Sequence, residues 1–216
     1  MKTERPTTLP ELVSCLAERG AERRILVALV GPPGAGKSTC AEQIVERLNA
    51  SGRLIAAVFP MDGYHLDDVI LNARGLRSRK GSPETFDVAG LQHMLGRLYR
   101  NEEHEIVVPV FDRSLEISRA GARLIPREIK VLIVEGNYLL LDTAPWSSLA
   151  QYFDVTVSIR VSEDELRRRL MERWESNGVA TSEVQAKVEV NDLPNGRIVI
   201  ARSVPSDFVL ELSQPY

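Results

Sequence analysis

Short, continuous apolar runs alternate with amphipathic stretches along most of this chain. RILVALV (24–30), LIAAVF (54–59), VLIVEG (131–136) and VTVSIRV (155–161) each predict a strand. Runs of this length without polar alternation are typical of strands that are buried on both faces. Three further strands are predicted at 106–111, at 197–201 and, on a weaker pattern, at 208–212.

Helical patterns fill the intervals between these runs. TLPE (8–11) predicts the start of a first helix that ends at Gly20, and a second helix is expected over 38–49. Asp87 is expected to cap a third helix, and 162–174 predicts a fourth with a regular apolar face. Strands separated by helices predict a three-layer α/β fold with a mainly parallel central sheet flanked by helices.

The composition narrows the class of protein. The chain has 216 residues, of which 44% are hydrophobic and 26% charged, and its net charge of −3 argues against non-specific nucleic-acid binding. It contains no apolar run of about 18 residues that would predict a membrane span, and its first residues lack the apolar core of a signal peptide. We therefore expect a cytoplasmic protein with no nucleic-acid or membrane partner, in which Cys15 and Cys40 are unpaired packing residues.

The most specific motif is GPPGAGKST (31–39), which follows a predicted buried strand and opens a predicted helix. This is the context that a phosphate-binding P-loop requires. Its glycines allow a tight turn whose amides converge on phosphate, and the helix N-terminus adds a favourable dipole. Lys37 is placed to reach the outer phosphates, and the Ser38 hydroxyl suits Mg²⁺. The nucleotide-binding residues predicted from this motif are Gly31, Pro32, Pro33, Gly34, Ala35, Gly36, Lys37, Ser38 and Thr39.

Two acids stand at the ends of apolar strands, where α/β proteins bind their ligands. Asp62 follows LIAAVFPM and Glu135 follows VLIV. An unpaired carboxylate is costly there, and a cation or a substrate hydroxyl relieves that cost. We assign Asp62 to the base or hydroxyl-orienting role and Glu135 to the metal side, with the reverse assignment left open. Tyr64 and His65 are predicted to line an acceptor pocket beside Asp62.

Three segments together resemble a known group of enzymes. They are similar to segments of the P-loop small-molecule kinases, a group that includes bacterial pantothenate kinase, uridine kinase and phosphoribulokinase. The three segments are MDGYHLDDVILNARGLRSRKGSPETFD (61–87), GPPGAGKST (31–39) and VEGNYLLLD (134–142). VPVFDRSLE (108–116) and NDLPNGRIV (191–199) are more similar to bacterial proteins of the nucleoside/nucleotide kinase family, some of them labelled fructose transport system kinase. The resemblance extends over most of the chain.

This resemblance implies a single P-loop kinase domain over 1–216, with a substrate-side excursion at 62–87 and a lid helix at 162–176. It implies ATP and Mg²⁺ as cofactors, with Asp62 as the base and Glu135 on the metal side. It also implies arginines that close over the phosphates. Arg169 and Arg173 are favoured among the candidates because they are four residues apart on one helix face; the other candidates are Arg167 and Arg168, and Arg168 is placed to pair with Glu172.

One departure from the family pattern concerns the acceptor. Pantothenate kinases carry a histidine in the stretch that corresponds to PVFDRSL (109–115), where this chain has Arg113 or a neighbour. The departure argues against pantothenate, and the Asp112–Arg113 pair suits a polyol, a sugar or an anionic substrate. The remaining substrate-binding candidates are Phe111, Arg79 and Lys80; for the last two the alternative is ordinary solvation.

The leading hypothesis is an ATP-dependent kinase that phosphorylates a hydroxyl of a small molecule, either a sugar such as fructose or a nucleoside. A pantothenate kinase-like activity is the first alternative. A regulatory ATPase without an acceptor is the second, and it gives no reason for a base at Asp62. A nucleic-acid-binding module is disfavoured by the charge and by the lack of interleaved aromatic residues. The sequence leaves the oligomeric state open, with a homodimer as the commonest assembly in general.

Overall fold

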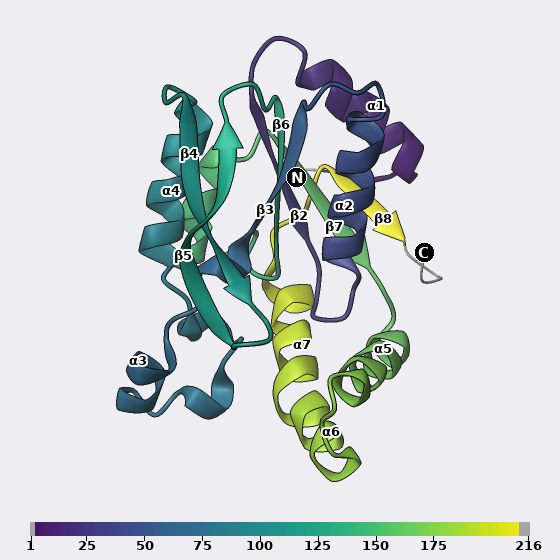
Figure 1. The fold of residues 1–216 in the computed structure, drawn as a ribbon. Coiled ribbons are helices and arrows are strands. Elements are labelled where there is room, and N and C mark those ends of the chain that lie inside the picture. The colour runs from purple at the N-terminus through teal and green to yellow at the C-terminus, as the bar shows by residue number, and fades with distance from the viewer. Residues whose placement is uncertain (1–2, 212–216) are drawn as a thin grey trace.

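The computed structural model describes residues 3–211, and its centre is a six-stranded sheet (Figure 1). The strands run in the order β1-β8-β7-β2-β6-β3, and every neighbouring pair is parallel. This confirms the predicted α/β fold. The strands of the sheet are β1 (Arg5–Pro6), β2 (Ile25–Val30), β3 (Ala56–Pro60), β6 (Val131–Gly136), β7 (Val155–Arg160) and β8 (Phe208–Glu211).

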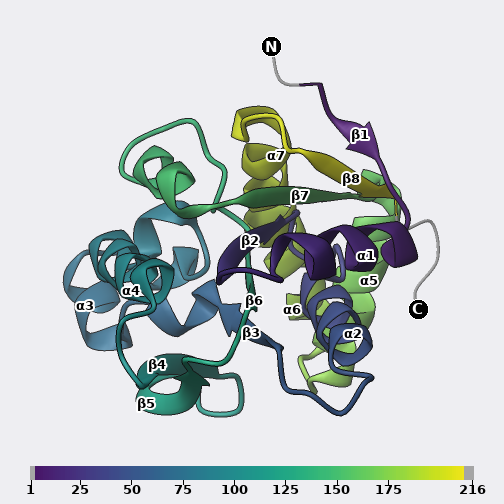
Figure 2. The same ribbon diagram turned by 90° about the horizontal axis from the view of Figure 1, so that it is seen from above.

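Helices cover both faces of this sheet (Figure 2). The first helix has the predicted ends: Thr8 and Glu11 form a capping box, and Gly20 caps the C-terminus. Asp87 caps its helix as expected, by accepting a hydrogen bond from the Gly90 amide. The helices are α1 (Leu9–Arg19), α2 (Lys37–Leu48), α3 (Asp68–Ala73), α4 (Val88–Arg100), α5 (Glu163–Ser176), α6 (Thr181–Lys187) and α7 (Leu193–Arg202).

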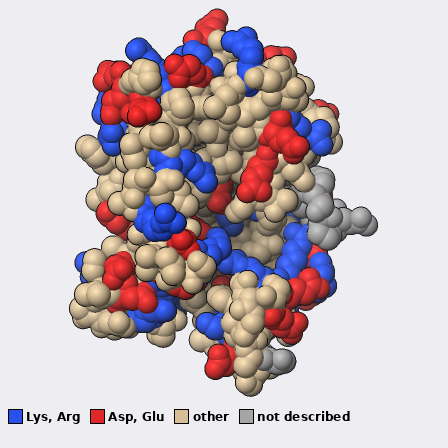
Figure 3. All heavy atoms as spheres, in the orientation of Figure 1, with Lys and Arg blue, Asp and Glu red and all other residues tan. Residues whose placement is uncertain are grey.

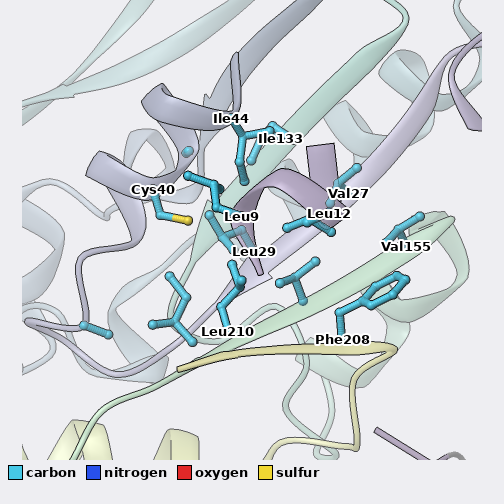
Figure 4. Close-up of a cluster of buried hydrophobic side chains, with 14 of the residues drawn as sticks. Leu9, Leu12, Val27, Leu29, Cys40, Ile44, Ile133, Val155, Phe208 and Leu210 are labelled. Atoms are coloured by element: carbon cyan, nitrogen blue, oxygen red, sulfur yellow. The ribbon is translucent and has the colours of Figure 1, made fainter. Parts of the chain in front are cut away.

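The central strand β2 supplies both halves of the core. Its six residues are buried, and alternate side chains point to opposite faces because a strand has a period of two. Val27 and Leu29 pack on one face with side chains of α1, α2 and β8 (Figure 4). Leu26 and Ala28 pack on the other face with the apolar side of α4. Burial on both faces explains why this strand is a continuous apolar run in the sequence.

The strand predicted at 197–201 is wrong, because these residues belong to helix α7. Its β-branched residues favour a strand, but the buried positions Leu193, Gly196 and Val199 are three apart, which is helical spacing. Tertiary packing therefore overrides the local propensity. The strand predicted at 208–212 is confirmed as β8, apart from Leu212, which lies outside the described residues.

The strand predicted at 106–111 exists but does not join the central sheet. It lies in β4 (Glu105–Asp112), which pairs antiparallel with β5 (Ile117–Pro126), a strand that the sequence did not predict. The resulting hairpin stands beside the edge strand β3, and Arg123 donates a 2.6 Å hydrogen bond to the carbonyl oxygen of Val58. This contact uses a backbone acceptor that an edge strand otherwise leaves open.

Two smaller predictions concern the cysteines and the membrane. Cys15 and Cys40 are both unpaired, and both pack with the core cluster between α1, α2 and the sheet. Among the described residues, no helix is long and apolar enough to cross a membrane.

Candidate functional site

Three strand ends converge at one edge of the sheet. β2 leads into the P-loop, the neighbouring β6 ends with Glu135 and Gly136, and β3 is followed by Asp62. The register places Glu135 opposite Leu29 of β2 on one side and Pro60 of β3 on the other. The P-loop and both acids therefore line one cavity of about 730 Å³. Lys and Arg atoms gather around a hollow on this face of the molecule (Figure 3).

The P-loop turn depends on two glycines with left-handed backbone. Gly34 has φ of 80° and Gly36 has φ of 86°, a region in which other residues are strained. Helix α2 then begins at Lys37, whose Nζ donates a 3.1 Å hydrogen bond to the carbonyl oxygen of Pro32. Burial lowers the pKa of Lys37 from 10.5 to about 8, against the opposing effect of Glu135 and Asp62. A lysine at a helix N-terminus is well placed to bind an anion.

Ser38 and Glu135 meet beside the P-loop. The Ser38 hydroxyl donates a 3.3 Å hydrogen bond to Glu135 Oε1. The Glu135 side chain is buried, and burial together with the negative charge of Asp62 raises its pKa. Among the described residues, no group of three or more His, Cys, Asp or Glu is arranged to hold a metal ion. The pair instead matches the sparse protein ligation of Mg²⁺, which keeps several waters and binds substrate phosphates.

Asp62 is held in place by the segment that follows β3. Residues 61–64 form a single helical turn, and the neighbouring Gly63 lies against the β4 backbone. A Cβ atom on Gly63 would stand 2.6 Å from the carbonyl oxygen of Pro109, so only glycine allows this approach. Asp62 Oδ2 accepts a 2.8 Å hydrogen bond from Arg113 Nη2 across the cavity.

The opposite wall is a helical hairpin made of α5, α6 and α7 (Figure 1). A π-helical turn at Val188–Asp192 joins α6 to α7, and such turns are frequent at functional sites. Trp174 on α5 donates a 2.7 Å hydrogen bond to Asp192 in that turn. Helix α7 also touches the P-loop, since a Cβ atom on Gly196 would stand 3.2 Å from Pro32 Cβ. The hairpin is thus packed across the nucleotide loop.

The two favoured arginines of α5 both line the cavity. Arg169 donates a 2.7 Å hydrogen bond to Glu165. Arg173 forms no ion pair among the described residues. Its pKa is lowered mainly by burial and, to a lesser extent, by repulsion from Arg113. Arg168 pairs with Glu172 at 2.6 Å, as predicted, and also with Glu165.

The predicted substrate residues divide into two sets. His65, Lys80, Phe111 and Arg113 line the cavity. The His65 ring packs between Phe86 and Phe111, and burial lowers its pKa. The other set lies elsewhere among the described residues: Tyr64 is buried in the core, Arg79 lies 3.9 Å from Glu84, and Asp112 pairs with Arg119 at 3.1 Å. The chemical role of each lining residue stays a prediction.

Sequence reasoning missed several polar residues of the cavity. Arg77, Asn137, Asn191, Asp192 and Asn195 lie in segments that carried the family resemblance, but none of them was assigned a role in the site. Asn191 donates a 3.1 Å hydrogen bond to the Lys80 carbonyl oxygen and accepts one from Asn195, which is 1% exposed. The local signal for Asn191, Asp192 and Asn195 was the NDLPNGRIV segment (191–199), which was used for the resemblance but gives no indication that it faces the cavity.

Known proteins resemble this chain over nearly its whole length. The sequence model of the AAA domain family matches residues 27–189. YggC of Escherichia coli K12, an uncharacterized protein, is 33% identical over 95% of this chain and 85% of its own length. A Schizosaccharomyces pombe protein provisionally named uridine kinase C227.14 is 31% identical over 88% of this chain and 84% of its own. A crystal structure from Silicibacter sp. TM1040, provisionally described as a fructose transport system kinase, has 40% identity and a TM-score of 0.86 over 94% of this chain and 98% of its own.

Proposed function

We propose that this chain, which belongs to the AAA domain family over residues 27–189 and is related to P-loop small-molecule kinases, transfers the γ-phosphate of ATP to a hydroxyl of a small molecule. Membership confirms the resemblance inferred from the three motif segments. The observation that carries the proposal is the presence of Asp62 in the same cavity as the P-loop. An enzyme that only hydrolyses ATP has no need of a carboxylate such as Asp62 that faces a second substrate.

Each wall of the cavity has a role in this proposal. The P-loop amides and Lys37 bind the phosphates, and Arg173 neutralises charge that develops on the transferred group. The acceptor oxygen attacks the γ-phosphorus, its proton passes to Asp62, and the bond from that phosphorus to ADP breaks. The residues on the acceptor side are His65, Lys80, Phe111 and Arg113, which line the cavity around Asp62.

P-loop kinases of this group use ATP with Mg²⁺. The residues of this chain fit that ion: Ser38 offers a hydroxyl, and the carboxylate of Glu135 is buried beside it with no cation paired to it among the described residues. Ser38 would hold the ion directly and Glu135 through water. When bound, Mg²⁺ would supply positive charge that offsets the negative charge of the phosphates.

The identity of the acceptor is the finer part of the proposal. We favour a sugar or sugar derivative over a nucleoside, which is supported by the likeness to the Silicibacter structure and by the polar lining near Arg113. The uridine kinase name of the yeast relative supports the nucleoside as the second candidate. Pantothenate is disfavoured because Arg113 or a neighbour stands where pantothenate kinases carry a histidine.

We also propose a single kinase domain with two closing elements. One is the excursion after Asp62, which includes α3, and the other is the hairpin α5–α7. Transfer to an acceptor requires that water be kept from the γ-phosphate, and elements that flank the cavity are able to do this by closing.

The substitution Asp62→Asn tests the base. The amide keeps the size of the side chain but cannot accept the proton, so we expect ATP binding to be retained and acceptor phosphorylation to fall by about 10²-fold or more. Purified protein is assayed for ADP release with sugars, nucleosides, polyols, hydroxy acids and pantothenate. Undiminished phosphorylation by the variant would remove Asp62 from the base role. Slow ATP hydrolysis that no acceptor stimulates would favour the regulatory ATPase.

A further inference from the structure

Arg113 lines the cavity, but the proposed reaction gives its positive charge no specific role. It follows β4 at the turn of the β4–β5 hairpin, and its side chain is 55% exposed. Its one hydrogen bond among the described residues goes to Asp62 Oδ2, at 2.8 Å. A guanidinium has five N–H donors, so most of its hydrogen-bonding capacity is open to a ligand.

The Asp62–Arg113 pair must weaken during the proposed transfer. When Asp62 takes the proton of an acceptor hydroxyl, it loses the negative charge that pairs with Arg113. A neutral acceptor therefore leaves a guanidinium without an ionised partner beside two other cations, Lys37 and Arg173. Arg113 is close enough to both that its positive charge helps to lower their pKa values. An acceptor with its own negative group replaces Asp62 as the partner of Arg113 and avoids this repulsion.

No other acid of the cavity forms an ion pair with Arg113 among the described residues. Of the described acids that line it, Glu135 bonds to Ser38, Asp192 accepts from Trp174, and Glu116 is solvent-exposed with no ion pair. Among the described residues, Asp62 is therefore the one carboxylate in an ion pair with Arg113, and the buried Glu135 acts on Arg113 only at longer range.

A second cation stands on the same wall. The Lys80 side chain is 8% exposed and lies with its Nζ 5.4 Å from the centre of the Phe111 ring. Its Nζ bonds to Asp68 at 2.7 Å, and Arg77 bonds to the same carboxylate at 2.6 Å. Two cavity-lining cations thus share one acid, which leaves net positive charge on this wall of the cavity.

We propose that the acceptor is a small hydroxylated anion, either a hydroxy acid or a sugar phosphate. Its carboxylate or phosphate binds the guanidinium of Arg113, with Lys80 on the same wall, while its hydroxyl donates a hydrogen bond to Asp62. Planar, bidentate recognition of such groups is what arginine does better than histidine or lysine. This inference rests on the proposed kinase function and names the substrate class of the same site.

Matched acceptor pairs test the inference. Each pair shares its hydroxyl groups and differs in one negative group: glycerate and glycerol, gluconate and glucitol, fructose 6-phosphate and fructose, pantothenate and pantothenol. We expect the anionic member of the productive pair to have a kcat/KM at least about tenfold higher. Comparison of the hydroxy acids with the sugar phosphate identifies which negative group Arg113 binds.

The variant Arg113→Met should abolish this preference, chiefly by raising the KM of the anionic acceptor, and Arg113→Lys should restore part of it. The matched control is Arg119→Met. Arg119 lies on the same hairpin with a side chain 59% exposed, pairs with Asp112 at 3.1 Å and does not line the cavity. We expect that control to keep the full preference.

Two results would overturn the inference while leaving the kinase proposal intact. One is a neutral acceptor that is used as well as its anionic partner. The other is an Arg113→Met enzyme in which both members of a pair lose activity equally and the KM for ATP rises, which would assign Arg113 to the nucleotide phosphates. A different result sinks both proposals: no acceptor of any class is phosphorylated, and none raises the Tm in the presence of a non-hydrolysable ATP analogue.

Discussion

Lys37 is predicted to be a residue that the protein keeps for function at the expense of stability. Its pKa falls from 10.5 to about 8 in the folded chain, mainly through burial. At about 1.4 kcal/mol for each tenfold change in proton affinity, this corresponds to a cost of about 3 kcal/mol for holding the charged side chain at neutral pH. Part of the side chain is accessible to solvent, so this figure is an upper bound.

The substitution Lys37→Met removes that cost and keeps most of the length of the side chain. It also removes the hydrogen bond to Pro32, which contributes about 1 kcal/mol. The net expectation is a protein that is more stable than the parent by up to about 2 kcal/mol without nucleotide. The same protein should lose phosphoryl transfer and the stabilisation that ATP gives the parent, because binding the folded state raises its stability.

The pH dependence gives a second readout of the same lysine. The folded-state pKa lies below the unfolded-state pKa, so between about pH 8 and 10.5 the unfolded chain binds the additional proton. The free energy of unfolding of the parent therefore gains from Lys37 as pH rises through this window, and the advantage of Lys37→Met shrinks.

Urea unfolding of parent and variant without nucleotide, at neutral pH and at about pH 10, measures both effects. The control is Lys130→Met, at a half-buried lysine outside the cavity. The reasoning is refuted if Lys37→Met is less stable than the parent at neutral pH, or if the difference does not narrow at high pH.

Two further predictions concern the walls of the cavity. Gly63→Ala should lower the free energy of unfolding by about 1–3 kcal/mol, because the new Cβ meets the Pro109 carbonyl oxygen at 2.6 Å. The control is Gly96→Ala, at a helical glycine where a Cβ would make ordinary contacts. Equal stability of the two variants would contradict the packing argument. A non-hydrolysable ATP analogue should slow amide hydrogen exchange in 67–82 and in the hairpin α5–α7, and unchanged exchange in both segments would count against closure over the phosphates.

The sequence by itself determined the features that depend on local order along the chain. The buried strand β2, the P-loop and the start of α2 are contiguous, so one motif in its flanking pattern predicts all three. Asp62 and Glu135 were found because each follows an apolar strand, and parallel strands bring their carboxyl ends to one edge. The resemblance of the same segments to P-loop kinases was confirmed by the comparisons.

Only the tertiary structure decided how segments distant in the sequence meet. The residues 197–201 became helix because α7 packs on the P-loop through Gly196 and on the core through Val199, contacts that no local propensity encodes. Tyr64 and Asp112 fell outside the cavity, while Arg113 came to face Asp62, 51 residues earlier in the chain. Which side of a turn a side chain occupies depends on the register of β4 with β5 and on their distance from β3, and these follow from packing across the whole molecule.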